Sequence, residues 1–137
     1  AGWSARAGAF RASARAPLAL WPGAGTGSGR AALLRAHPLL ADGVVTGRGF
    51  GRTLVAAGLE REGWGPRLVP LRVGWSVFVD AARPWDGLRA PAVATWLIDG
   101  GVSLRVVGPA GSGTVRLSAA HGFVDGAAAL SWAWEAP

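Results

Sequence analysis

The sequence contains no cysteine, methionine, tyrosine, lysine, asparagine or glutamine. The lack of cysteine excludes disulfide bonds, thiol chemistry and cysteine-containing zinc sites. The lack of lysine excludes a phosphate-binding P-loop, so the glycine-rich run at 23–30 is predicted to be a flexible turn. No apolar run approaches the roughly 18 residues that a membrane-spanning helix needs, and no signal peptide is visible at Ala1. The apolar residues must therefore be accommodated in another way.

The abundant residues are alanine, glycine and arginine, the imprint of a gene rich in G and C. The 137 residues are half hydrophobic and carry a net charge of +6, with a sequence pI of about 11.7. This length fits one domain. Strong basicity raises nucleic acid as a partner, but the 14 arginines are spread along the chain. A nucleic-acid surface needs clustered basic residues, so we expect no nucleic-acid partner.

The clearest pattern is an alternation from Leu71 to Trp85, in the run LRVGWSVFVDAARPW. Apolar side chains occupy the odd positions up to 81, whereas the even positions include Arg72, Ser76 and Asp80. This period of two predicts a β-strand with one apolar face. At roughly ten residues or more, such a strand is long enough to cross a bilayer at a tilt.

The same design recurs in other segments, with bulky apolar residues on one face and glycine, alanine, serine or charged residues on the other. These segments are 53–60, 98–106, 115–120 and 127–134, and a fainter alternation lies within 1–16. The connecting segments 17–30, 30–50, 62–70, 83–91 and 121–126 are predicted to be loops, and GPAGSG at 108–113 a tight turn. The sequence thus predicts an all-β fold of about five or six antiparallel strands.

Two classes of protein use such strands. In a soluble sandwich the apolar face packs on a second sheet, whereas in an outer-membrane barrel it contacts lipid and the other face lines the lumen. The short turn at 108–113 and the long connectors at 30–52 and 83–95 favour the barrel. Tryptophans near segment ends, as in an aromatic girdle, favour it too: Trp64, Trp85, Trp96, Trp132 and Trp134. The predicted lipid-facing residues are Leu71, Val73, Trp75, Val77, Val79, Leu130, Trp132 and Trp134.

Three motifs occur in order along the chain: GLE at 58–60, VFVDAARPW at 77–85 and DGGVSLRVVGPAGSGTVRLSAAHGF at 99–123. Together they resemble the C-terminal strands of the Omp85 superfamily, the bacterial surface antigen barrels that include BamA and TamA. The resemblance covers residues 33–134. Within it, LRAH at 34–37 is similar to the Arg-Gly-aromatic motif of the family's long sixth loop. Ala36 stands where the family has glycine, and the chain continues past the final aromatic position at Trp134.

The resemblance implies a role for three charged residues. In relatives the loop arginine folds into the lumen and meets acids on the next two strands. The corresponding residues here are Arg35 for the arginine and Glu60 and Asp80 for the acids. Both acids fall on the face that the alternation assigns to the lumen. Two carboxylates favour a guanidinium in a partly desolvated site through charge-assisted hydrogen bonds. The alternative is that the acids pair with nearer arginines on the strands, namely Arg72, Arg105 or Arg116.

Catalytic and metal-binding residues are sparse. His37 and His121 are the only histidines, and without cysteine the ligand set of a structural zinc site is missing. No G-x-S-x-G nucleophile elbow accompanies His121 and Asp125. We therefore predict no enzymatic activity, no metal and no cofactor, and we expect both histidines to lie in surface loops.

The resemblance implies the C-terminal part of an outer-membrane barrel, as an open fragment, in a Gram-negative-type bacterium. Its expected function is non-enzymatic assembly or translocation of other outer-membrane proteins, by strand pairing at the seam of the barrel. The expected partners are outer-membrane lipid, substrate outer-membrane proteins and periplasmic or lipoprotein partners. The alternatives are a small outer-membrane barrel or soluble sandwich with a binding or structural role, or a barrel appended to a lipid-acting hydrolase.

Overall fold

A computed structural model describes residues 1–26, 33–42, 44–45, 49–68, 71–87, 95–109 and 112–136. The described part is all-β apart from one short 3₁₀ turn, η1 (Leu18–Leu20). Its strands are β1 (Gly2–Arg11), β2 (Leu40–Ala41), β3 (Val44–Val45), β4 (Thr53–Leu68), β5 (Leu71–Trp85), β6 (Leu97–Val107), β7 (Thr114–Gly122) and β8 (Ala128–Glu135). None of the helical segments in this part of the chain is long and apolar enough to cross a membrane.

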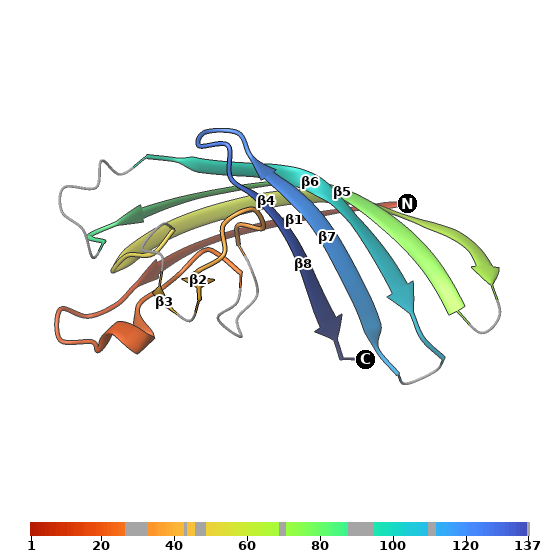
Figure 1. Cartoon of the computed structure of the whole chain (residues 1–137), viewed down its shortest axis with the longest axis horizontal. Helices are drawn as coiled ribbons and strands as arrows, with labels where there is room; N and C mark the ends of the chain where they lie inside the picture. Colours follow the sequence, from red (N-terminus) through yellow and green to blue (C-terminus); the bar gives the residue numbers. More distant parts are fainter. Residues whose placement is uncertain are drawn as a thin grey trace.

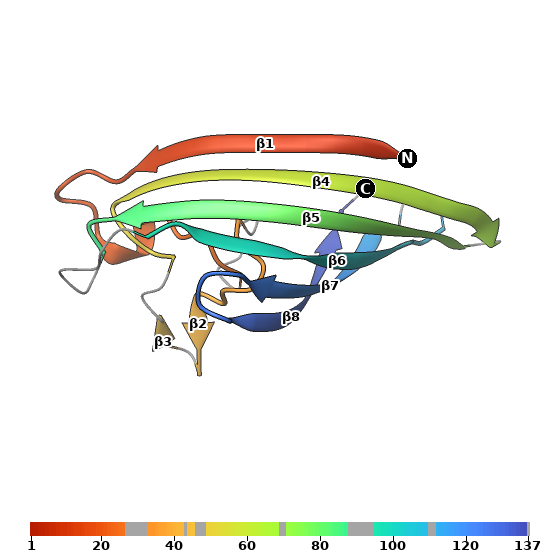
Figure 2. The same cartoon turned by 90° about the horizontal axis from the view of Figure 1, so that it is seen from above.

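Six strands form one antiparallel sheet in the order β1-β4-β5-β6-β7-β8. The sheet is strongly curved, with β1 and β8 at its two edges (Figures 1 and 2). Among the described residues β1 and β8 do not pair with each other, so the sheet is open. The prediction of an open, antiparallel all-β fold of five or six strands is therefore confirmed.

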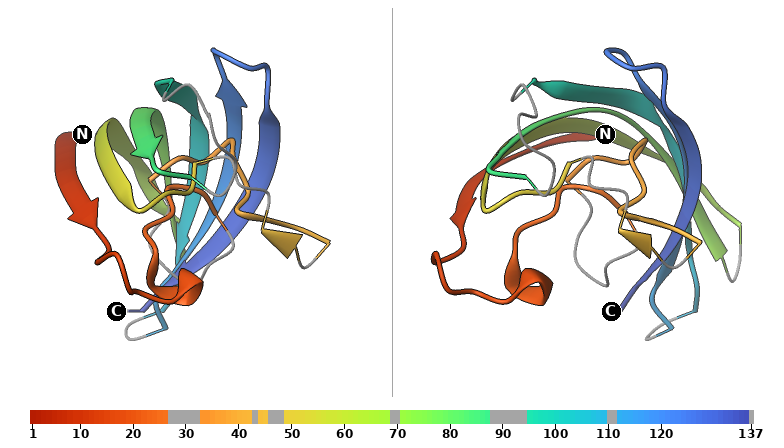
Figure 3. Two further views of the ribbon diagram at one scale, coloured as in Figure 1. Left: turned by 90° about the vertical axis from the view of Figure 1, so that its left-hand side faces the viewer. Right: turned by 60° about the vertical axis from the view of Figure 1, so that its left-hand side comes forward.

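The described parts of the segment between β1 and β4 fold back onto the concave side of this sheet (Figure 3). They include the small hairpin of β2 and β3, so the prediction of one long loop at 30–50 was incomplete. Ala24 and Leu34 of this segment are fully buried against Leu54 of β4 and Ala82 of β5. This apolar cluster fixes the segment under one end of the sheet.

The alternation of the sequence is the alternation of the two faces of the sheet. Along β5, the side chains at even positions from Gly74 to Ala82 are buried and those at odd positions from Trp75 to Val79 are exposed. The register keeps like positions side by side, as in the cross-strand row of Ser76, Ser103, Ser118 and Ser131 on the concave face. Small, polar and charged residues thus share the concave face.

The connector predicted at 62–70 was wrong in its first part, because β4 continues to Leu68. Its glycines and Pro66 are typical of turns, but a register shift between Trp64 and Arg67 accommodates them within the strand. Trp64 also departs from the girdle prediction. It lies at an even position on the concave face. Its ring covers Gly74, because a Cβ atom at that glycine would lie 2.5 Å from the ring.

Candidate functional site

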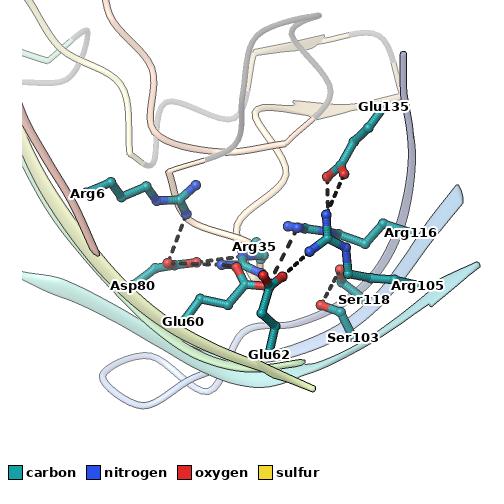
Figure 4. A network of polar contacts seen from close by, with 10 residues as sticks. All are labelled: Arg6, Arg35, Glu60, Glu62, Asp80, Ser103, Arg105, Arg116, Ser118 and Glu135. Carbon is teal, nitrogen blue, oxygen red and sulfur yellow. Dashed lines mark hydrogen bonds and ion pairs between the residues drawn. The ribbon is translucent and has the colours of Figure 1, made fainter. Parts of the chain in front are cut away.

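The concave face carries a network of charged side chains centred on Arg35 (Figure 4). Arg35 Nε donates to Asp80 Oδ2 at 2.8 Å, and its Nη2 donates to Glu60 Oε2 at 2.8 Å. The side chain of Asp80 has no exposed surface, and that of Arg35 is 5% exposed. The guanidinium therefore lies between two carboxylates in a largely desolvated site, which favours strong charge-assisted hydrogen bonds.

The pairing of β4 with β5 places the two acids beside each other. Gly58 is the register partner of Asp80, and Glu60 lies two residues further along the same face. A Cβ atom at Gly58 would lie 2.7 Å from Asp80 Oδ1 and 2.8 Å from Arg6 Nε. Glycine is therefore favoured at this position, because the carboxylate and the side chain of Arg6 occupy the space above it.

Arg6 of β1 is a third member of the site, since its Nη2 donates to Asp80 Oδ1 at 2.9 Å. Sequence reasoning missed this contact. The available signal was the faint alternation in the first strand, which puts Arg6 on the concave face together with Ser4. A cavity of about 240 Å³ adjoins Arg6, Arg35 and Asp80. This volume is large enough for water, so the Arg6 side of the network can be hydrated.

Contacts with the Phe78 ring hold the loop in place beside Arg35. The Arg35 guanidinium carbon lies 3.5 Å from the ring centroid of Phe78, a cation–π contact. Ala36 packs with Phe78 and Ala120 in a buried cluster. Gly101 leaves room for the ring, because a Cβ there would lie 2.7 Å from Phe78 Cζ. Ala36 does not have a positive φ, so an alanine at this position causes no backbone strain.

A second set of ion pairs continues the network toward β8. Arg105 bonds to Glu62 and donates to Glu135 at 2.9 Å. Arg116 lies 3.2 Å from Glu135 and 3.6 Å from Glu60. With the Arg35 group, these pairs match four arginines to four carboxylates, so the charges within this network cancel.

The structure therefore brings together Arg35, Glu60 and Asp80, the three residues that the resemblance singled out. The arginines on the strands, which were the alternative partners of Glu60 and Asp80, mostly contact other residues. Arg116 shares Glu60 at the longer distance, Arg105 pairs with Glu62 and Glu135, and Arg72 stacks on Trp64 at 4.7 Å from its centroid.

His37 is not a surface-loop histidine, and that expectation was wrong. Its side chain is 3% exposed, with Nδ1 2.8 Å from Asp99 Oδ1 and Nε2 2.9 Å from Asp125 Oδ2. The reason is its neighbour Arg35, whose ion pairs carry the loop into the concave face. His121 is exposed, as expected, but it lies in β7 and not in a loop. No group of three or more ionisable side chains in the described residues could hold a metal ion.

The convex face is exposed and mostly apolar, with Arg61 of β4, the register partner of Val77, as a charged exception. Trp75, Val77 and Val79 of β5 are 47%, 43% and 51% exposed, and Leu130 of β8 is 86% exposed. The other residues predicted to face lipid lie on the same face. They occupy the odd positions of β5 and the even positions of β8: Leu71, Val73, Trp132 and Trp134. The molecule thus has apolar residues outside and a neutralised charged network inside its curve.

Comparisons with known proteins give no relative for this chain. No family model, no curated protein and no solved structure matches it.

Proposed function

We propose that the chain forms the C-terminal strands of a membrane-embedded β-barrel of the Omp85 type. In this proposal the convex face contacts the lipid of a bacterial outer membrane, and the concave face lines the lumen. The observation that carries it is the polarity of the curved sheet, with Trp75, Val77 and Val79 exposed outside while Asp80 is fully buried inside. Transmembrane barrels have this distribution, with an apolar outer band and a polar interior.

The distribution argues against a soluble sandwich. A sandwich buries its apolar faces between two sheets, whereas the apolar face here is the convex one and the concave face holds the ion pairs. A row of exposed valine, leucine and tryptophan side chains across several strands is costly in water. In a hydrocarbon phase the same row is favourable, because the lipid tails are equally apolar.

We further propose that the intact protein assembles other outer-membrane proteins by strand pairing. The sheet supports this through its edge at β8, which pairs only with β7 among the described residues. Free N–H and C=O groups at such an edge can template an incoming strand. Six strands are too few to enclose a lumen with this loop inside, so further strands of the same protein would complete the barrel. No catalytic group is needed for this activity.

Cysteine cross-linking tests the pairing, because the chain has no cysteine of its own. Ser131→Cys places a single thiol on β8, at the edge of the sheet. A stalled outer-membrane substrate with one cysteine in its last strand should form a disulfide with this variant in native membranes. The matched control is Ser103→Cys, in the same serine row but flanked by β5 and β7. Equal yields at both positions, or no product at Ser131, would exclude pairing at β8.

A further inference from the structure

Three residues, His37, Asp99 and Asp125, hold the loop that carries Arg35 on the side facing β6. They are named the His37 clamp. Asp99 lies on β6 and has no exposed surface, and Asp125 lies in the connector between β7 and β8. The two ring nitrogens of His37 each lie within 2.9 Å of a carboxylate oxygen. Arg35 links the loop to β4 and β5, whereas the clamp links it to β6 and to the β7–β8 connector.

Two carboxylates this close to one imidazole favour a proton on both ring nitrogens. A neutral imidazole has one N–H donor and one acceptor nitrogen, and an ionised carboxylate only accepts. A neutral His37 would therefore leave an unprotonated nitrogen within 2.9 Å of a carboxylate oxygen. The imidazolium donates from Nε2 to Asp125, and its Nδ1 forms an ion pair with Asp99 at 2.8 Å that lacks hydrogen-bond alignment. The register partner of Asp99 on β5 is Asp80, whose charge is engaged with Arg35 and Arg6. Glu60 is engaged with Arg35 and Arg116.

The clamp also supports the backbone of the loop. Ala36 N–H donates to Asp99 Oδ2 at 2.6 Å, so one buried carboxylate serves both the loop backbone and the histidine. The carbonyl of His37 accepts from Thr26 N–H at 3.1 Å, which joins the two halves of the segment between β1 and β4. Loss of the histidine contacts would therefore weaken the packing of the whole loop against the sheet.

We propose that the His37 clamp is a proton-controlled device that holds the loop against β6 and the β7–β8 connector and loosens it when the imidazolium is deprotonated. The device depends on the fold and not on the proposed assembly function.

The sign of the pH effect follows from the surroundings of the imidazole. His37 lies on the loop, outside the strands, and its pKa is raised above the usual 6.5, first by the close contact with Asp99 and then by Asp125, against burial, which lowers it. A raised folded-state pKa means that the stabilisation is complete below the unfolded-state pKa and is lost as the pH rises through the folded-state pKa. The loop is thus held below the unfolded-state pKa of about 6.5 and loosened as the pH rises through the raised folded-state pKa of His37.

Nitrogen NMR of the histidine ring tests the protonation directly. In the intact protein in detergent micelles, His121→Ala leaves one imidazole of this chain to observe. We expect the His37 titration midpoint to lie above the usual value of about 6.5, with both ring nitrogens protonated below it. A midpoint at or below that value, or a single protonated nitrogen at pH 6, overturns the proposal.

Hydrogen exchange of the loop amides tests the mechanical consequence. After correction for intrinsic exchange rates, protection at 33–39 should fall by up to about tenfold per pH unit as His37 deprotonates, since one proton is linked. His37→Gln should abolish this dependence, and Asp125→Asn should move it to lower pH by removing one carboxylate. Peptides from β6 serve as the internal control. Unchanged pH profiles in Asp125→Asn, or a profile in His37→Gln parallel to that of the parent, overturn the proposal even if one variant folds poorly.

Discussion

Removal of the negative charge of Asp80 is the sharpest test of the network. Asp80→Asn keeps the shape of the side chain but leaves Arg35 with Glu60 alone and leaves Arg6 without its carboxylate. Breaking a buried ion pair costs about 3–5 kcal/mol because the remaining charge is uncompensated. The pair with Arg6 adds less than about 1 kcal/mol, because the Arg6 side chain is 39% exposed and screened by water.

The retained bond to Glu60 puts the expected loss at the lower end, about 3 kcal/mol. The assay is urea unfolding of the protein in lipid vesicles, followed by the fluorescence of its tryptophans, of which this chain has 8. With a denaturant slope of about 2 kcal/mol per molar, the midpoint should fall by about 1.5 M.

The matched control is Asp86→Asn, the same chemical change at an exposed aspartate. Asp86 has a φ of 53°, which asparagine also tolerates, so its effect should stay within about 0.5 kcal/mol. An Asp80→Asn variant as stable as this control would refute the ionic network. A double-mutant cycle with Arg35→Ala should give a coupling of about 1–3 kcal/mol, and additive effects would show that the two residues do not act as a pair.

Two further substitutions test the lipid-facing row and the close approach beneath Asp80. Val77→Arg, near the middle of β5, should lower stability in vesicles by about 2–4 kcal/mol, whereas Leu71→Arg at the strand end should cost about 1 or less; urea titration in vesicles measures both, and two harmless variants would indicate a water-facing surface. Gly58→Ala should cost about 1–3 kcal/mol by displacing the buried Asp80 carboxylate, and Gly2→Ala, whose Cβ would have only ordinary contacts at 3.8 Å, is its control. Equal unfolding midpoints for the two alanine variants would contradict the steric argument.

The faces of the strands could be predicted from the sequence. In β5 and β6 the period-two pattern assigned Val77 and Val102 outward and Asp80 and Ser103 inward, as observed. This works because side-chain direction in a strand depends on local geometry alone. Strand ends were less predictable, as at Gly65 in β4, since turn-forming residues can be accommodated by a bulge.

The partners inside the curve depend on tertiary structure. The resemblance indicated that Arg35 would meet Glu60 and Asp80, but nothing local indicated the contact between Arg6 and Asp80, which are 74 positions apart. It depends on β1 pairing with β4 across the long intervening segment.

The sequence by itself determined that this protein is a sheet with one apolar and one polar face, because alternation is a property of each strand. Only the tertiary structure decided that the sheet curves around its own loop and that His37 is buried between two carboxylates. The physical reason is that the clamp joins residues 37, 99 and 125, which the fold brings together through strand register and loop docking. Pairing across such separations leaves no periodic trace in the sequence.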